Sequence, residues 1–296
     1  MKILLTGRNG QLGSEMYRSL STQGKVYAFN SGELNLAEPR KIVDVIHDIK
    51  PDIIINTAAY TAVDKAELEP LYANNINHLA PSIMAREAEK IGSTIIHFST
   101  DYVYDGTKQG AYVESDPTNP LNIYGRTKLA GDIAVSNMCS RHLILRTSWV
   151  HGAYGHNFIK TIFRLAHEKQ EINVVIDQRG IPTSATFLAD TTINLLIQAY
   201  KKPESFPYGI YHLTALGNTS WYEYARFIIQ ECLDRGLPLK LPVDGIKSIK
   251  TIDYKTQATR PLNSCLDTSK FRDTFNMHLP EWEKGVRHTL NQFITS

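Results

Sequence analysis

The feature that most constrains the fold of this chain is the alternation, over its first half, of short apolar segments with longer amphipathic ones. Short apolar runs are typical of strands buried on both faces, and such strands alternate with helices in parallel sheets. Right-handed crossovers place helices on both sides of the sheet. We therefore predict a doubly wound α/β fold with strands over residues 2–6, 25–30, 52–57, 93–99 and 142–147 and helices over 11–21, 38–49, 70–91 and 120–137.

The pattern becomes less regular after about residue 150. It predicts helices over residues 157–168, 186–200 and 221–235, with Ser220 as the N-cap of the last, and strands over 172–176 and 209–214. Connections containing Pro or Gly punctuate this half, and no flexible linker divides it from the first. We expect two tightly packed lobes, residues 1–150 and 151–296, with a cleft between them and with some elements of the second packing back on the first.

Composition and charge exclude several classes of protein. The 296 residues include 32 Lys and Arg against 30 Asp and Glu, and the basic residues are scattered, so neither nucleic acid nor a membrane is an expected partner. No apolar run reaches the roughly 18 residues of a membrane span, and the N-terminal apolar stretch is too short for a signal peptide. Cys139, Cys232 and Cys265 fit neither a zinc cluster nor a disulfide framework, so we expect no metal site, reduced thiols and a soluble cytoplasmic protein.

A glycine-rich segment follows the first predicted strand and opens the first predicted helix. Glycine permits a tight turn and lets backbone amides approach a pyrophosphate, and the helix N-terminus adds unpaired N–H groups and a positive dipole end. The G-x-x-G-x-x-G spacing is weak by itself, but its position favours a dinucleotide site. We predict a Rossmann-type NAD(P)-binding domain over residues 1–150 and a smaller, mixed α/β lobe, mainly substrate-binding, over 151–296. The phosphate loop is Gly7-Arg8-Asn9-Gly10-Gln11-Leu12-Gly13.

The residue at the end of the second strand usually selects the cofactor. An acid there accepts hydrogen bonds from the ribose and repels a 2′-phosphate. Here the strand ends at Asn30, and Arg8 in the glycine loop can reach a 2′-phosphate. The alternative is that Arg8 is an ordinary solvated loop residue. We expect NADPH to be preferred and NADH to be tolerated.

Tyr124 and Lys128 are candidates for proton transfer at a carbonyl oxygen. They lie four residues apart, so they share one face of the helix that is predicted to start with Asn119 as N-cap and Pro120 in its first position. A free phenol has a pKa near ~10. A neighbouring ammonium in a partly buried site, together with an oxidised nicotinamide ring, is expected to lower that pKa toward the working pH.

A second pair with the same spacing, Tyr104 and Lys108, makes the motif ambiguous by itself. The Asp-Gly between them argues for a turn. Tyr124 instead follows the segment 98–103, which leaves the fourth strand at its carboxyl end, where open α/β sheets bind ligands. In that segment Thr100 can offer its hydroxyl to a substrate oxygen, or it can simply satisfy a backbone group. Context therefore favours Tyr124.

Together these motifs resemble those of the extended short-chain dehydrogenases/reductases and, more narrowly, of the dTDP-4-dehydrorhamnose reductase family. The resemblance spans essentially the whole chain. The sequence AAYTAVD at 58–64 and the segments around Trp149 and Arg260 separate this family from other nucleotide-sugar enzymes better than the Tyr-Lys pair does. The matching blocks are residues 56–67, 120–131, 146–150, 177–183, 260–264 and 282–283.

The resemblance implies reduction of the C4 ketone of dTDP-6-deoxy-L-lyxo-4-hexulose (dTDP-4-dehydro-6-deoxy-L-mannose) to dTDP-L-rhamnose. In that reaction Tyr124 would protonate the developing alkoxide, Thr100 would polarise the same oxygen, and Lys128 would hold the nicotinamide ribose. Residues implied at the cofactor, besides the glycine loop, Asn30, Tyr124 and Lys128, are Ala58, Ala59 and Tyr60. Residues implied at the substrate are Val63, Thr100, Asp101, Tyr102, Trp149 and, toward the diphosphate, Arg260. Without the resemblance, Trp149 would be assigned to the core.

Some positions depart from the family pattern. Asn30 stands where relatives often have Asp, and Cys265 stands where they often have Arg, which puts one nucleotide contact in doubt. Some relatives hold a magnesium ion with acidic side chains at a dimer contact. Glu15 fits one such position, but Thr186 occupies another, so Mg²⁺ binding and a homodimer both stay open.

Two rival functions also stay open. One is another nucleotide-sugar reductase, epimerase or dehydratase of the same superfamily; Asp101 is followed by Tyr102 rather than Glu, which disfavours a dehydratase. The other is a non-catalytic, NADP-binding regulatory subunit, which would not need the proton donor Tyr124.

Overall fold

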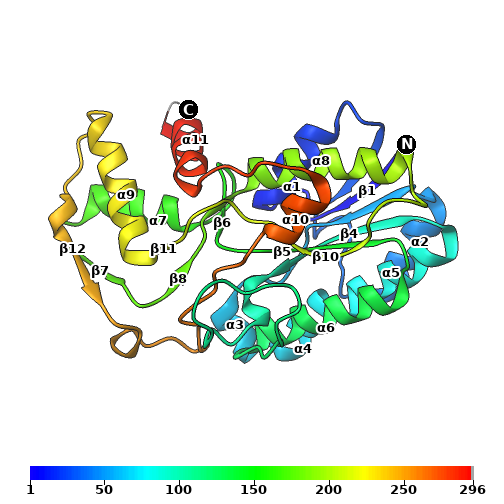
Figure 1. Cartoon of the computed structure of the whole chain (residues 1–296), viewed down its shortest axis with the longest axis horizontal. Coiled ribbons are helices and arrows are strands. Elements are labelled where there is room, and N and C mark those ends of the chain that lie inside the picture. The colour runs from blue at the N-terminus through cyan, green and yellow to red at the C-terminus, as the bar shows by residue number, and fades with distance from the viewer. Residues whose placement is uncertain (295–296) are drawn as a thin grey trace.

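The computed structural model describes residues 1–294 and is built around a six-stranded sheet in which all neighbouring strands are parallel (Figure 1). The strand order is β10-β5-β4-β3-β1-β2. The strands are β1 (Lys2–Thr6), β2 (Lys25–Phe29), β3 (Ile53–Asn56), β4 (Thr94–Thr100), β5 (His142–Thr147) and β10 (Gly209–His212). Each lies within a residue or two of a predicted strand, because β-branched apolar runs of this length suit a sheet buried on both faces.

Helices cover both faces of the sheet, as predicted. α1 (Gln11–Leu20) and α8 (Ala185–Lys201) pack together on one face, whereas α2 (Pro39–Ile49), α5 (Ala80–Ile91) and α6 (Ile123–Met138) cover the other (Figure 1). Separate apolar clusters fill the two interfaces. The strand order reverses between β1 and β3, and doubly wound sheets bind ligands at the carboxyl ends of the strands at such a point.

The remainder of the chain forms a smaller, mixed α/β part with its own apolar core. Its helices are α7 (Phe158–Glu168), α9 (Trp221–Asp234) and α11 (Trp282–Ile294), and its main strand pair is β7 (Ile172–Val175) with β12 (Ile246–Ile249) (Figure 1). Not all of the second half lies here, because α8 packs on α1 and β10 pairs with β5 in the large sheet.

Two predicted N-caps had different outcomes. Ser220 caps α9 as predicted, since its hydroxyl accepts a hydrogen bond from the N3 backbone in a complete capping box. The prediction of Asn119 as the cap of α6 is wrong. Asn122 caps that helix: its side-chain oxygen accepts from the Gly125 N–H (2.8 Å). Its amide donates to Thr259 O (2.8 Å), a contact distant in sequence that fixes the helix start three residues later than predicted.

The predicted helix over 70–91 is continuous but contains a π-helical turn. It comprises α4 (Pro70–Asn74), the π turn η1 (Asn75–Leu79) and α5. Pro81 has no N–H, so the carbonyl of Asn77 cannot receive the usual hydrogen bond, and the helix widens there. The main chain of α6 approaches this carbonyl closely: a Cβ placed on Gly131 would lie 2.2 Å from Asn77 O.

Several short elements lack a sequence pattern long enough to predict them. The two-residue strands among them form by pairing with distant segments rather than by local propensity. The short elements are α3 (Val63–Leu68), η2 (Asp101–Val103), β6 (Val150–His151), β8 (Arg179–Gly180), β9 (Thr183–Ser184), β11 (Thr219–Ser220), η3 (Val243–Gly245), η4 (Thr251–Asp253) and α10 (Ser269–Phe275).

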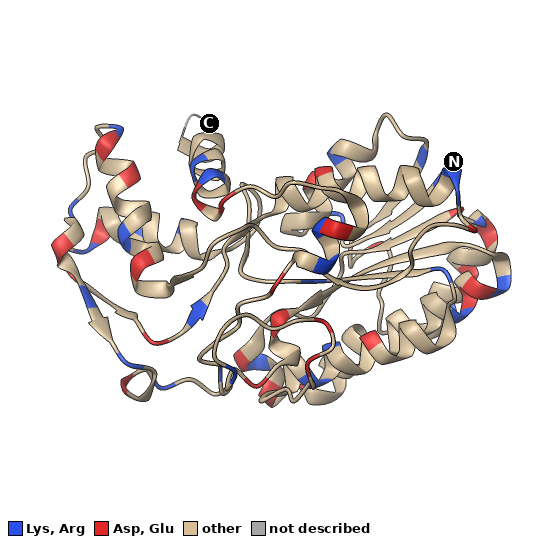
Figure 2. Cartoon of the chain, viewed as in Figure 1, with Lys and Arg blue, Asp and Glu red and all other residues tan. Residues whose placement is uncertain are grey.

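Acidic and basic residues are interspersed over both parts of the molecule (Figure 2). Within residues 1–294, no helix combines the length and apolarity needed to cross a membrane. Cys139, Cys232 and Cys265 are all buried and unpaired, as expected for reduced thiols.

Leu188→Ala tests whether α8 belongs to the core of the large sheet. Leu188 is fully buried in the cluster beneath α1 and α8, so its truncation should lower the free energy of unfolding by about 2–5 kcal/mol. Urea unfolding followed by circular dichroism measures the loss, and we expect one transition for the whole chain. The exposed Leu71→Ala is the control, with an expected change within about 0.5 kcal/mol. A Leu188→Ala loss as small as the control's would contradict the assignment.

Candidate active site

A cavity of about 800 Å³ lies at the predicted crevice and reaches from the glycine loop to aromatic residues of the smaller part. Arg8, Gly13 and Arg260, which were predicted to bind ligand, are not among the residues that line it. The predicted residues that do line it are Gly7, Asn9, Gly10, Gln11, Leu12, Asn30, Ala58, Ala59, Tyr60, Val63, Thr100, Asp101, Tyr102, Tyr124, Lys128 and Trp149.

The glycine loop turns sharply from β1 into α1. Gly7 has a φ of +79°, which favours glycine, and its carbonyl accepts a hydrogen bond from the Gly10 N–H (2.9 Å). A Cβ at Gly13 would lie only 1.9 Å from Gly7 O, so Gly13 serves close packing of α1 on the loop rather than ligand contact. Gly10 is the N-cap of α1 and offers no side-chain hydrogen bond. The first amides of α1 therefore suit an anion such as a pyrophosphate.

A carboxylate that the sequence analysis missed lies at the end of β2. Glu33 binds the Arg8 guanidinium (3.0 Å) and also accepts the Asn30 N–H (2.9 Å). Arg8 additionally donates to Ala28 O (3.3 Å). Arg8 is therefore a held cation beside the cavity, neither freely solvated nor pointing into it. The sequence signal that could have identified Glu33 is an acidic residue within a few positions of the strand end.

Tyr124 lies in the first turn of α6 and keeps part of its surface open to the cavity. Its ring makes an edge-to-face contact with that of Tyr102 (5.7 Å between centroids). Burial raises the pKa of Tyr124 to about 12, against a smaller opposing effect of the Thr100 hydroxyl. The expected lowering involves Lys128 together with an oxidised nicotinamide ring, and it stays a prediction. A phenol in this environment keeps its proton at neutral pH, as a proton donor must.

Lys128 is almost fully buried one helical turn after Tyr124. Its ammonium donates to Phe98 O (2.6 Å) and lies 3.4 Å from His97 Nε2, both on β4. Burial lowers the pKa of Lys128 to about 8, although the nearby Asp132 carboxylate raises it. Lys128 therefore carries its positive charge at neutral pH, but its pKa lies not far above neutrality.

Thr100 and Asp101 form a connected pair where β4 ends. The Thr100 hydroxyl donates to Asp101 Oδ1 (2.9 Å), and the Ser148 hydroxyl donates to Asp101 Oδ2 (2.9 Å). Burial raises the pKa of Asp101 to about 6, and hydrogen bonds from Ser264, Thr100 and Ser148 oppose it. A hydroxyl carries one proton, so Thr100 can donate to a substrate oxygen only by turning away from Asp101. Asp101 lines the cavity, and it links Thr100 to Ser148, the residue that follows β5.

Trp149 has an aromatic partner that the sequence analysis did not single out. Its ring stacks on that of Trp221, with centroids 3.5 Å apart and planes 7° apart, and both residues line the cavity. Trp149 has a φ of +43°, which is unusual for a residue other than glycine and occurs most often at functional sites. The position of Trp221 as first residue of α9 carried no sequence signal for a site, because it matched an ordinary helical core pattern.

Arg260 lies beside the substrate end but is held by an acid. Its guanidinium binds both oxygens of Asp64, at 2.6 and 3.3 Å. Asp64 also accepts the backbone N–H of Ala258 (3.0 Å), so this pair joins the segment before Arg260 to α3. A phosphate contact by Arg260 would have to replace or share the contact with Asp64.

The competing Tyr104–Lys108 pair is structural. Tyr104 is fully buried, and its hydroxyl accepts from Arg146 (2.9 Å) and contacts His212 Nε2 (2.8 Å). Lys108 pairs with Asp116. The two side chains therefore serve separate contacts, and neither residue lines the large cavity.

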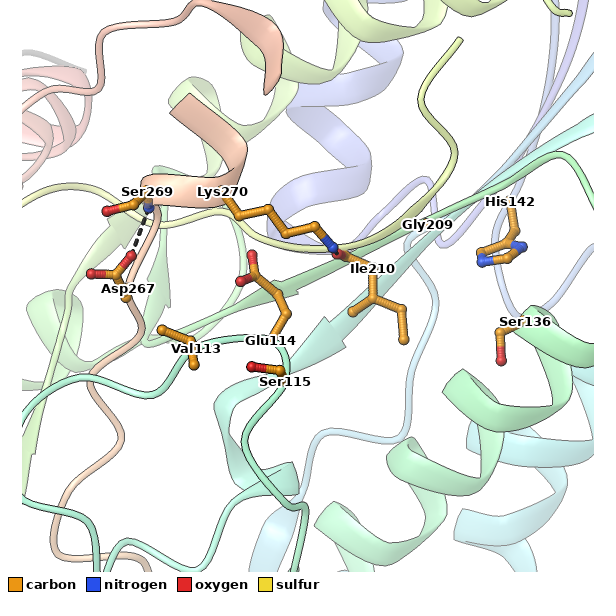
Figure 3. Close-up of a pocket in the computed structure, with 10 residues that line it drawn as sticks. All are labelled: Val113, Glu114, Ser115, Ser136, His142, Gly209, Ile210, Asp267, Ser269 and Lys270. Carbon is orange, nitrogen blue, oxygen red and sulfur yellow. Dashed lines mark hydrogen bonds between the residues drawn. The ribbon is translucent and has the colours of Figure 1, made fainter. Parts of the chain in front are cut away.

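A second cavity, of about 670 Å³, lies at the outer edge of β10 (Figure 3). Lys270 donates to Ile210 O (2.7 Å), and Glu114 accepts the His212 N–H (2.8 Å). These side chains occupy backbone groups of an edge strand that would otherwise be free to pair with another chain. This cavity therefore lies at an edge of the sheet where side chains already bond free backbone groups of the edge strand.

The positions considered for magnesium, Glu15 and Thr186, lie on the packed helices α1 and α8. Glu15 is buried and its carboxylate is bound by Arg18 (3.1 Å), and Thr186 brings no charge. Within residues 1–294 no group of three or more His, Cys, Asp or Glu side chains is arranged to hold a metal ion.

Comparison with known proteins identifies the family of this chain. Residues 1–295 match the family described as RmlD substrate binding domain. A dTDP-4-dehydrorhamnose reductase of Escherichia coli (strain K12) is 43% identical over all of this chain and 99% of its own length.

Two solved structures are also similar over nearly the whole chain. A dTDP-4-dehydrorhamnose reductase of Clostridium acetobutylicum has a TM-score of 0.91 at 32% identity, covering 99% of this chain and 100% of its own. One from Bacillus anthracis, solved in complex with NADP, has a TM-score of 0.89 at 34% identity, covering 98% and 99%. With full-length identity at this level and the predicted cavity residues in place, the chain belongs to the dTDP-4-dehydrorhamnose reductase family.

Proposed function

We propose that this chain reduces the C4 ketone of dTDP-6-deoxy-L-lyxo-4-hexulose to dTDP-L-rhamnose, with NADPH as hydride donor and Tyr124 as proton donor. The observation that carries the proposal is a single cavity that joins a dinucleotide-type glycine loop to Tyr124, Thr100 and Lys128. The family of the chain and the NADP complex of the Bacillus anthracis relative support it.

The cofactor end is formed by backbone amides and one buried cation. The amides of the glycine loop and of the α1 N-terminus suit the pyrophosphate, and Lys128 lies where it can hold the hydroxyls of the nicotinamide ribose. NADPH, when bound, supplies the hydride that reduces C4. Arg8 lies near the end of β2, where a 2′-phosphate is recognised in this fold class, and its pairing with Glu33 leaves room for NADH as well.

Tyr124 supplies the proton that balances the hydride. Its raised pKa keeps the phenol protonated until negative charge develops on the C4 oxygen. The C=O bond then becomes a secondary alcohol, and the proton lost by Tyr124 leaves a phenolate. Lys128, one turn along the same helix, provides the nearby positive charge that this phenolate needs. Thr100 directs the substrate oxygen toward Tyr124 once its hydroxyl turns from Asp101.

The substrate end combines aromatic and basic groups. The stacked Trp149 and Trp221 offer an apolar surface that suits a deoxysugar, whose C6 is a methyl group. Val63 and Tyr102 also line the cavity. Arg260 is placed for the diphosphate if it shares its guanidinium with Asp64, because a planar fork suits phosphate oxygens.

We expect this activity in the cytoplasm. Three buried thiols without a disulfide are typical of a reducing compartment. A sugar nucleotide carries several negative charges, and the local amides and Arg260 suffice to meet them in a chain of net charge +2.

The direct test follows NADPH absorbance after adding enzymatically prepared dTDP-6-deoxy-L-lyxo-4-hexulose, with the product compared chromatographically with dTDP-L-rhamnose. We expect stoichiometric NADPH oxidation and a rhamnose product. Absence of oxidation above background would indicate a binding or regulatory protein. A C4-epimeric product, or much faster reduction of another nucleotide 4-ketosugar, would indicate one of the rival enzymes.

Tyr124→Phe should lower kcat by about 10²–10⁴-fold, because the variant keeps the ring but loses the proton donor. NADPH affinity, measured by fluorescence titration, should change little. Tyr104→Phe is the matched control, since Tyr104 carries the same Tyr-x-x-x-Lys spacing but only structural contacts. It should lower the melting temperature and leave kcat nearly unchanged. A near-normal kcat in Tyr124→Phe, with a large loss in Thr100→Ala, would reverse the assigned roles.

NADPH should give a higher kcat/KM than NADH, with NADH still used. Arg8→Ala should reduce the NADPH-to-NADH ratio by at least about tenfold, because it removes a charged hydrogen bond to the 2′-phosphate. Initial rates with both cofactors at saturating sugar nucleotide measure the ratio. A tenfold preference for NADH in the unmodified chain would refute the assignment.

A further inference from the structure

The carboxylate of Asp132 lies in a buried polar cluster beneath the active site. Asp132 is one helical turn after Lys128 on α6 and is 1% exposed. One of its oxygens, Oδ2, accepts a hydrogen bond from Arg146 Nε (3.1 Å). The other, Oδ1, makes no hydrogen bond of good geometry among residues 1–294, although the Ser99 hydroxyl interacts with the carboxylate. Burial raises the pKa of Asp132, and Arg146, Lys128 and Ser99 oppose that rise. A buried carboxylate with an oxygen that lacks a well-formed hydrogen bond is costly to stability, which calls for a reason beyond packing.

His97 connects Asp132 to Lys128. Its Nε2 lies 3.9 Å from Asp132 Oδ1 and 3.4 Å from Lys128 Nζ. Its Nδ1 lies 3.0 Å from the side-chain nitrogen of Asn56, whose oxygen already accepts a hydrogen bond from Thr6 (2.6 Å). A neutral imidazole has one acceptor nitrogen, so His97 accepts either from the Asn56 amide at Nδ1 or from the Lys128 ammonium at Nε2. Burial keeps His97 neutral by holding its pKa well below the usual value.

The charges around Lys128 balance only through Asp132. Arg146 is a second buried cation on β5 and is bound to the same carboxylate. If Asp132 were neutral, these two cations would face each other in the protein interior without a carboxylate between them. At the far end of α6, Glu67 of α3 accepts the Ile123 N–H (2.8 Å). The titratable groups that interact with Lys128 are Asp132 of α6 and His97 of β4, and Arg146 of β5 interacts in turn with Asp132.

We propose that Asp132 is a positioning residue for the reduction, which keeps the buried Lys128 ammonium charged beside Tyr124. The proposal rests on the function assigned to Tyr124 and Lys128 above. Asp132 does not line the cavity. It acts through Lys128, whose positive charge holds the ribose and stabilises the Tyr124 phenolate.

Asp132→Asn tests this by the shape of the pH profile. The pKa of Lys128 is about 8 with Asp132 in place, so about half of the wild-type molecules carry the charge at pH 8. Loss of the carboxylate lowers this pKa; a decrease of about one unit leaves about a tenth of the molecules charged at pH 8. Between pH 6 and pH 8, kcat/KM should fall about twofold in the wild type and about tenfold in Asp132→Asn. A variant profile that differs from wild type only by a constant factor overturns the proposal.

Matched variants separate this effect from a loss of stability. Asp132→Glu restores a carboxylate and should restore the wild-type profile. Glu87→Gln removes another buried carboxylate, one that Lys90, Arg86 and His47 bind on the outer side of α5. It should lower the melting temperature and leave the profile unchanged. An equal displacement of the profile in Glu87→Gln overturns the proposal. If Asp132→Asn does not fold, the smaller Asp132→Ser serves as the neutral variant.

NADPH binding, measured by fluorescence in the same buffers, gives a readout that needs no turnover. The dissociation constant of Asp132→Asn should rise about tenfold from pH 6 to pH 8 and that of the wild type about twofold. If the wild type binds NADPH but does not reduce the sugar nucleotide, the proposed function fails while the binding profile still tests Asp132. Equal pH dependence in both proteins overturns the role of Asp132 alone.

Discussion

The close approach of α6 to its neighbours is the constraint on which the rest of the active site depends. A Cβ on Gly125 would lie 2.2 Å from Tyr102 O, and one on Gly131 would lie 2.2 Å from Asn77 O. Lys128 lies midway between these glycines on the same helical face, so its side chain is directed beneath the end of β4. Tyr124, one turn earlier, is left at the edge of the cavity. Larger side chains at the two glycines would move the helix outward, and the Tyr-Lys pair with it.

This packing buries two cations, and a carboxylate buried near them compensates their charge. Lys128 and Arg146 are buried cations, and Asp132 is the carboxylate that contacts Arg146 directly and lies next to Lys128 through His97. Burial raises the pKa of Tyr124 and lowers that of Lys128, because it favours the uncharged form of each group. The Tyr124 phenol therefore keeps its proton until negative charge develops on a substrate oxygen. A chain with almost no net charge can thus hold strong local fields where the chemistry occurs.

Much of the fold and of the site could be predicted from sequence because the signals are local. The large sheet follows from apolar runs, and the glycine loop follows from spacing next to the first strand. Context in the chain also selected Tyr124 over Tyr104, whose hydroxyl serves Arg146 and His212 instead. What sequence missed depends on residues far apart: Glu33 against Arg8, Asp64 against Arg260, and Trp221 against Trp149. In each pair, one residue was predicted to contact a ligand, and no motif of its own identified the other.

The sequence by itself determined the doubly wound sheet, the glycine loop between its first strand and helix, and the choice of Tyr124 as the proposed proton donor, since each rests on a short pattern of apolarity, glycine or helical spacing. Only the tertiary structure decided the protonation and orientation of these groups. The pKa of Tyr124 is raised because burial outweighs the opposing effect of the Thr100 hydroxyl. The start of α6 moves to Asn122 because Thr259, from the far end of the chain, accepts its amide. Burial sets the pKa of Tyr124 and a long-range contact sets the start of α6, so neither can be predicted from neighbouring residues in the sequence.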